Sequence, residues 1–183
     1  NSMNDFKRMY QFTDNYTTIR VKGKVVSEGA RDPLTRMEHV PIDLTNKTVI
    51  DLGCNCGGTL YAVHEQIKHG YGYELNQEAV NNALTVKHDY KVDNLDFTQV
   101  DLQETMPDWP DYDVLFCFSI ARWVNNWKDI LEKLDPKVMI FEAHGKPAHL
   151  DEQLEFLHSK FTKVDHLHTA RETKVRSLYL CEK

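Results

Sequence analysis

The feature that most constrains the fold of this chain is a glycine-rich turn between an apolar strand and a helix. Residues 49–59 read VIDLGCNCGGT, and residues 71–74, which read YGYE, form the end of a second strand that closes on a carboxylate. Glycines let the backbone approach a ligand, and an acid at the end of the next strand accepts hydrogen bonds from ribose hydroxyls. The segment therefore predicts an α/β fold that binds a nucleotide at the carboxyl ends of parallel strands.

The spacing inside this turn separates two classes of nucleotide-binding protein. A dinucleotide fingerprint is G-x-G-x-x-G, and Asn55 stands where its second glycine would be, which disfavours a dehydrogenase. The remaining pattern, D-x-G-x-x-x-G, consists of Asp51, Gly53 and Gly57, with Glu74 after the next strand. This pattern resembles motif I and the acidic loop of the class I S-adenosylmethionine-dependent methyltransferases.

The resemblance implies S-adenosylmethionine as cofactor, S-adenosylhomocysteine as product, and a set of cofactor contacts. Asp51 would organise the turn around the methionine part, and Glu74 would accept hydrogen bonds from both ribose hydroxyls. Asp101 matches the family position that meets the adenine amino group. For each acid the alternative is an ordinary turn or surface residue. The other expected contacts are Gly53, Cys54, Asn55, Gly57, Leu75, Leu102, Phe118 and Ser119.

The segment after the fourth strand is expected to face the methyl acceptor. It contains neither the Asn/Asp-Pro-Pro-aromatic motif of amino-methylating DNA enzymes nor the Pro-Cys pair of carbon-5 pyrimidine enzymes. Arg122 could clamp an anionic group of the substrate, or it could be solvated. Trp123 could stack on a base or ring, or it could pack the following helix on the sheet. The stretch around Ser119–Trp123 is also similar to methylphosphate capping enzymes, which methylate RNA 5′ phosphates.

Two further candidates follow the fifth strand, where Glu142 and His144 should lie near the acceptor. His144 is the candidate general base, because the pKa of histidine lies near neutrality; the alternative is a polar loop histidine. Arg122 and His144 are thus the catalytic candidates, and Arg122, Trp123, Glu142 and His144 are the substrate candidates. Methyl transfer to an anionic oxygen needs little acid–base help, so a missing base is compatible with the chemistry.

Alternating strand and helix patterns predict a single domain with a three-layer α/β/α Rossmann-like sandwich. Residues 1–46 would form an N-terminal cap that selects the substrate, and residues 47–183 the methyltransferase core. Within the cap, Asp32 before Pro33 predicts the N-cap of a short helix that Pro41 would end. The connection at 169–174 is too short for a crossover helix, so the sheet should be mostly parallel with one antiparallel strand near the C-terminus. Its seven strands are expected at about 48–53, 70–75, 95–100, 112–119, 137–143, 162–168 and 175–182, and the helices at about 59–68, 77–90, 126–134 and 150–160.

The composition of the chain limits the classes of partner, from nucleic acid to membrane and metal, that the protein is expected to bind. The chain has 22 basic and 28 acidic residues and a net charge of −6, a balance that disfavours duplex DNA. It contains no apolar run of the length that a membrane span needs. The four cysteines lack the paired spacing of a zinc site, so we expect no metal and a reducing, cytoplasmic setting.

Three functions remain open at this point. A methyltransferase acting on an oxygen or nitrogen of a small molecule is favoured by the compact, acidic chain. An RNA-directed methyltransferase is favoured by Arg122 and Trp123 and by a basic stretch in the terminal hairpin. A non-catalytic, cofactor-binding accessory module is the third. The basic stretch comprises Lys160, Lys163, His166, His168, Arg171, Lys174 and Arg176. Arg31 and Arg36 precede the core, and either is a candidate to meet the cofactor carboxylate.

Overall fold

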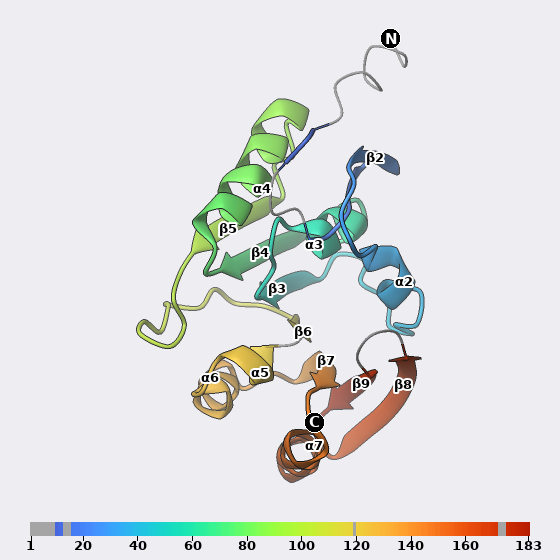
Figure 1. The fold of residues 1–183 in the computed structure, drawn as a ribbon, viewed down its shortest axis with the longest axis vertical. Coiled ribbons are helices and arrows are strands. Elements are labelled where there is room, and N and C mark those ends of the chain that lie inside the picture. The colour runs from blue at the N-terminus through green and yellow to red at the C-terminus, as the bar shows by residue number, and fades with distance from the viewer. Residues whose placement is uncertain (1–9, 13–15, 119, 172–174) are drawn as a thin grey trace.

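The structure is a computed structural model that describes residues 10–12, 16–118, 120–171 and 175–183. A seven-stranded sheet forms the centre of the molecule, with helices on both of its faces and a short N-terminal hairpin at one end (Figure 1). The strands are β1 (Ile19–Val21), β2 (Lys24–Ser27), β3 (Thr48–Leu52), β4 (His69–Glu74), β5 (Leu95–Gln99), β6 (Val114–Phe118), β7 (Val138–His144), β8 (Lys163–Arg171) and β9 (Val175–Glu182). The helices are α2 (Pro33–Met37), α3 (Gly58–Val63), α4 (Gln77–Tyr90), α5 (Ile120–Trp123), α6 (Trp127–Leu134) and α7 (Pro147–Lys160).

The order of the strands across the sheet is β5-β4-β3-β6-β7-β9-β8. The first five are parallel to one another, and β9 runs antiparallel to both of its neighbours, β7 and β8. The predicted sheet, with seven strands of which one is reversed, is therefore confirmed. The reversal follows from the short connection between β8 and β9, which leaves no room for a crossover helix.

Two apolar clusters cover the two faces of the sheet and make the three layers. One joins the sheet to α3, α4 and the N-terminal hairpin, and the other joins it to α6 and α7. Neighbouring residues of β3 alternate between them, since Val49 belongs to the first cluster and Ile50 to the second. All five residues of β6 are buried, as expected for a central parallel strand covered on both faces.

Three local predictions need correction or addition. Asp32 caps α2 as expected, with its side chain accepting from the Leu34 amide, but the helix already ends at Met37 rather than before Pro41. Helix α3 ends at Val63, earlier than the predicted 68. The side-chain amide of Asn94 donates to the carbonyls of His64 and Ile67 beyond it, so these groups are satisfied outside a helix. The short helix α5 was not predicted.

Among the described residues, no helix is both long and apolar enough to cross a membrane.

Candidate cofactor and acceptor site

The predicted site residues meet at one edge of the sheet. Because β3, β4, β6 and β7 are parallel, their carboxyl ends bring Asp51, Glu74, Phe118 and Glu142 to the same edge. The N-terminal segment reaches this edge as well, since a Cβ on Gly58, at the start of α3, would lie 2.5 Å from Thr17 Oγ1. The fold thus places the glycine turn, three strand-end acids and the N-terminal segment at the same edge.

Left-handed backbone conformations shape the glycine turn. Gly53, Asn55 and Gly57 have φ angles of 71°, 52° and 84°, a region that glycine enters without strain. The Gly53 amide donates to the Tyr73 carbonyl at 2.8 Å and ties the turn to β4. A Cβ at Gly53 would have no described atom within 4 Å, whereas one at Gly57 would lie 2.5 Å from Phe97 Cε1. Gly53 therefore faces open space where a ligand can approach the backbone, and Gly57 is required by packing.

Glu74 links the turn to the start of α4. Its Oε1 accepts from the Asn55 amide at 2.7 Å, and its Oε2 accepts from the Asn76 amide at 2.8 Å. The next residue, Leu75, is 59% exposed at this edge. A carboxylate oriented by two backbone amides, followed by an exposed apolar side chain, fits a ribose and the face of an adenine.

Asp51 is a buried acid beneath the turn, with 2% of its surface exposed. Its pKa is raised to about 7, chiefly by burial; the positive charge of Arg36 acts in the opposite direction, and the negative charge of Glu74 adds to the rise. Such a shift is typical of groups at functional sites.

Arg36 interacts with residues on both predicted sides of the site, that of the cofactor and that of the acceptor. Its guanidinium lies 4.0 Å from the centre of the Phe118 ring, and its Nη1 lies 3.8 Å from Glu142 Oε2. Arg176 Nη1 lies 3.5 Å from the other carboxylate oxygen of Glu142. Burial lowers the pKa of Arg36, and Glu142 and Asp51 offset that effect. No local sequence pattern predicts Arg176 at this site, because it is contributed by β9, far along the chain from Arg36.

A cavity of about 130 Å³ opens beside this cluster, between α2, β7 and the β8–β9 hairpin. It is lined by Ala30, Arg31, Asp32, Thr35, Arg36, Glu142, His168, Ala170, Arg176 and Leu178.

The donors and acceptors at the edge match the polar groups of S-adenosylmethionine. Arg36 Nε and Asn55 Oδ1 are buried without a hydrogen-bond partner among the described residues. Arg36 Nε can donate to a carboxylate beside Asp51, and Asn55 Oδ1 can accept from a ligand in the turn. With the Glu74 carboxylate and the open face of Gly53, these groups fit the amino acid and ribose parts of that cofactor.

The other predicted contacts are placed as follows. Asp101 lies just beyond β5, where its Oδ1 accepts from the Gln103 amide, and Leu102 beside it is buried. Cys54 is buried within the turn. Ser119 lies outside the described residues. These roles stay predictions.

The acceptor candidates differ in accessibility. His144 ends β7 with 2% of its surface exposed, and both of its ring nitrogens are buried. Arg122 and Trp123 lie on the surface of α5, with the Arg122 guanidinium 4.7 Å from the centre of the Trp123 ring, and Trp123 is 65% exposed. Trp127, rather than Trp123, packs α6 on the sheet by contacting Phe141. The catalytic and substrate roles of Arg122, Trp123, Glu142 and His144 stay predictions.

All four cysteines, Cys54, Cys56, Cys117 and Cys181, are buried and free of disulfides. Burial raises the pKa of each thiol, which disfavours a reactive thiolate. Within the described part of the chain, no group of three or more His, Cys, Asp or Glu side chains could hold a metal ion.

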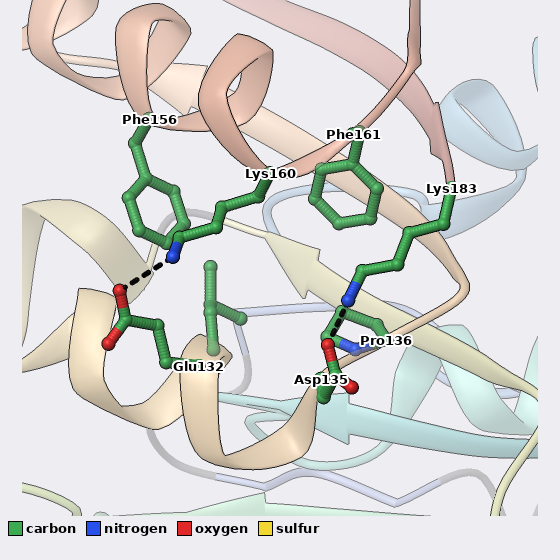
Figure 2. Close-up of a pocket in the computed structure, with 8 residues that line it drawn as sticks. Glu132, Asp135, Pro136, Phe156, Lys160, Phe161 and Lys183 are labelled. Atoms are coloured by element: carbon green, nitrogen blue, oxygen red, sulfur yellow. Dashed lines mark hydrogen bonds and ion pairs between the residues drawn. The ribbon is translucent and has the colours of Figure 1, made fainter.

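A second cavity, of about 270 Å³, lies far from this chemistry (Figure 2). Asp135 and Pro136 precede β7 and Lys183 follows the reversed strand β9, so this cavity opens at the opposite edge of the sheet. Its two lysines are engaged, Lys160 with Glu132 at 3.0 Å and Lys183 with Asp135.

Residues 43–171, more than half of the chain, match the family described as methyltransferase domain. The chain belongs to this family, which confirms the prediction of a class I methyltransferase with S-adenosylmethionine as cofactor. A search of curated proteins finds no sequence match.

Solved structures show the same fold. The N-terminal domain of EvdMO1 with S-adenosylhomocysteine bound superimposes with a TM-score of 0.73 at 13% identity, covering 100% of this chain and 97% of that one. YcgJ from Bacillus subtilis gives 0.65 at 11% identity, covering 82% and 97%. The bifunctional kinase-methyltransferase WbdD gives 0.70 at 17% identity, with 94% of this chain but only 44% of WbdD covered.

Proposed function

We propose that this protein transfers the methyl group of S-adenosylmethionine in line to an oxygen nucleophile of a small molecule, with nitrogen as the alternative acceptor atom. One observation carries the proposal. The cavity of about 130 Å³ is lined by Glu142, near the carboxyl end of β7, and by residues of the N-terminal segment and the terminal hairpin. A recess of this size suits part of a small molecule better than an extended polynucleotide.

The residues divide into a cofactor side and an acceptor side. Glu74 would hold the ribose with Leu75 against the adenine, while Asp51 and Arg36 would hold the amino acid part. When bound, S-adenosylmethionine supplies a methyl group on a positively charged sulfur. Glu142, buried at the end of β7, would orient the acceptor by accepting a hydrogen bond from its hydroxyl group.

Little more is needed from the protein than orientation and exclusion of water, because the sulfonium supplies the driving force. His144 stays the candidate base for a neutral hydroxyl. Its burial requires that the acceptor reach into the edge of the sheet beyond Glu142.

A similar structure suggests a sugar hydroxyl as one acceptor of the kind proposed. The N-terminal domain of EvdMO1 was also crystallised in the presence of S-adenosylhomocysteine and D-fucose, and that structure covers 97% of this chain with a TM-score of 0.71. At 14% identity the likeness extends to the fold, so the acceptor of this chain has to be identified by experiment.

The RNA-directed alternative rests on Trp123, which is exposed with Arg122 stacked on it. The basic stretch of the hairpin supports it less, since Lys160 pairs with Glu132 and Lys163 with Asp165. Lys174 lies outside the described residues.

Incubation with methyl-labelled S-adenosylmethionine and a cell extract, followed by separation of small molecules, RNA and protein, tests the proposal. We expect label in the small-molecule fraction, and much less of it when Glu74→Gln replaces the wild type at a cofactor concentration that does not saturate the variant. Label in RNA would refute the small-molecule assignment. Measurable cofactor binding without label in any fraction would favour the accessory module.

A further inference from the structure

The cavity beside Glu142 is distinct from the region that holds the cofactor. Its lining includes neither the residues of the glycine turn nor Glu74, and comes instead from the N-terminal segment, β7 and the terminal hairpin. Arg36 is the residue shared by the two, since it also contacts Phe118 and feels the charge of Asp51. The cavity therefore offers room for a group of the methyl acceptor beside the cofactor.

The lining carries an excess of positive charge. Three arginines, Arg31, Arg36 and Arg176, line the cavity together with the carboxylate of Glu142. Glu142 interacts with two of them at 3.8 and 3.5 Å, longer than direct hydrogen bonds. The other carboxylate of the lining, Asp32, is held by both terminal nitrogens of Arg20, one of them at 2.7 Å. The acids present thus leave the arginines incompletely neutralised.

Two of these arginines also have a buried N–H donor for which the described residues provide no hydrogen-bond acceptor. Arg31 Nη1 and Arg36 Nε have no accessible surface and no hydrogen-bond partner among the described residues. Arg31 forms no ion pair within that part of the chain, and Arg176 donates through its other terminal nitrogen to the Tyr16 hydroxyl at 3.1 Å. Buried donors of charged groups are expensive to leave unsatisfied. Arg36 Nε can reach the cofactor carboxylate, so the donor left for an anion in the cavity is Arg31 Nη1.

From this geometry we infer that the cavity binds an anionic group of the methyl acceptor, a phosphate or a carboxylate, with Arg31 and Arg176 as the residues that select it. The planar guanidinium groups suit the paired oxygens of such anions. Arg36 would be shared with the cofactor, and Glu142 would separate the anion from the reacting hydroxyl. The inference rests on the proposed function, because it assigns the cavity to the acceptor of that reaction.

The test uses the full chain saturated with S-adenosylhomocysteine, so that the place of the cofactor carboxylate is filled. Inorganic phosphate and acetate are titrated separately by calorimetry. We expect saturable binding of at least one of them, and the stronger ligand names the anion. Arg31→Gln and Arg176→Gln should each weaken that binding by about tenfold or more, the effect of losing one charge-assisted hydrogen bond, with affinity for S-adenosylhomocysteine changed less than about twofold.

Arg171→Gln is the matched control, because Arg171 is an exposed arginine at the end of β8 that does not line the cavity. It should leave the binding of both ligands unchanged. Bound S-adenosylhomocysteine without saturable binding of either anion would overturn the anion site and leave the proposed function standing. If Arg31→Gln weakened the binding of the anion and of S-adenosylhomocysteine equally, Arg31 would belong to the cofactor site, and the anion site would also be overturned. Absence of S-adenosylhomocysteine binding to the wild type would instead refute the proposed function.

Discussion

Replacement of Glu74 by glutamine tests the assignment of the ribose site most directly. In the protein without ligand, each carboxylate oxygen accepts one backbone amide, from Asn55 and from Asn76. A glutamine offers one oxygen, and its NH₂ group would face either an amide hydrogen or a ribose hydroxyl that is oriented to donate. At least one hydrogen bond to a charged acceptor is lost, which corresponds to about 1.5–3 kcal/mol.

That loss predicts binding of S-adenosylhomocysteine that is about 10- to 150-fold weaker, measured by isothermal titration calorimetry. Glu74→Ala should bind more weakly still, because both oxygens are removed. Glu65→Gln is the matched control: Glu65 is exposed just beyond the end of α3, so this variant removes the same charge away from the turn. An affinity of Glu74→Gln within about threefold of the wild type, with the fold intact by circular dichroism, would refute the ribose assignment.

Other predictions concern the turn and the surface. Burial raises the pKa of Asp51 from 3.8 to about 7, so the folded protein binds this proton more tightly than the unfolded chain, and the free energy of unfolding should fall as pH rises from about 4 to about 7. Denaturant titrations across that range should show a smaller decline in Asp51→Asn. Gly57→Ala should lower the free energy of unfolding by about 2–5 kcal/mol, because the left-handed backbone is strained by a side chain and the added Cβ clashes with Phe97. Gly53→Ala should lower it by about 1–2 kcal/mol, because only the backbone strain applies there. Equal losses in the two variants would contradict the open space at Gly53. Trp123→Ala should leave the melting temperature within about 2 °C, since the side chain is 65% exposed, and reduced turnover in that variant would place Trp123 on the acceptor.

Much of the core was predictable because its signals are local. The apolar run ending at Asp51, the glycines of the turn and the short connection before Val175 each determine backbone geometry within a few residues. Parallel strands then bring their carboxyl ends together, so the meeting of Asp51 with Glu74 followed from the strand pattern alone. Helix ends were less predictable: α3 stops early, where the side chain of Asn94 satisfies carbonyls beyond its end.

The acceptor side depended on contacts that no local pattern encodes. In sequence, Arg176 belongs to a basic hairpin and Arg31 to the N-terminal segment, and only the tertiary fold brings both to the cavity that Glu142 lines. The same packing decides that Trp123 is exposed while Trp127 is buried, although the two share similar surroundings in the chain. The sequence by itself determined the nucleotide-binding half of the protein, because strand ends and glycine turns are local features. The charge and shape of the acceptor cavity were decided only by tertiary structure, because they arise from residues brought together across the whole chain.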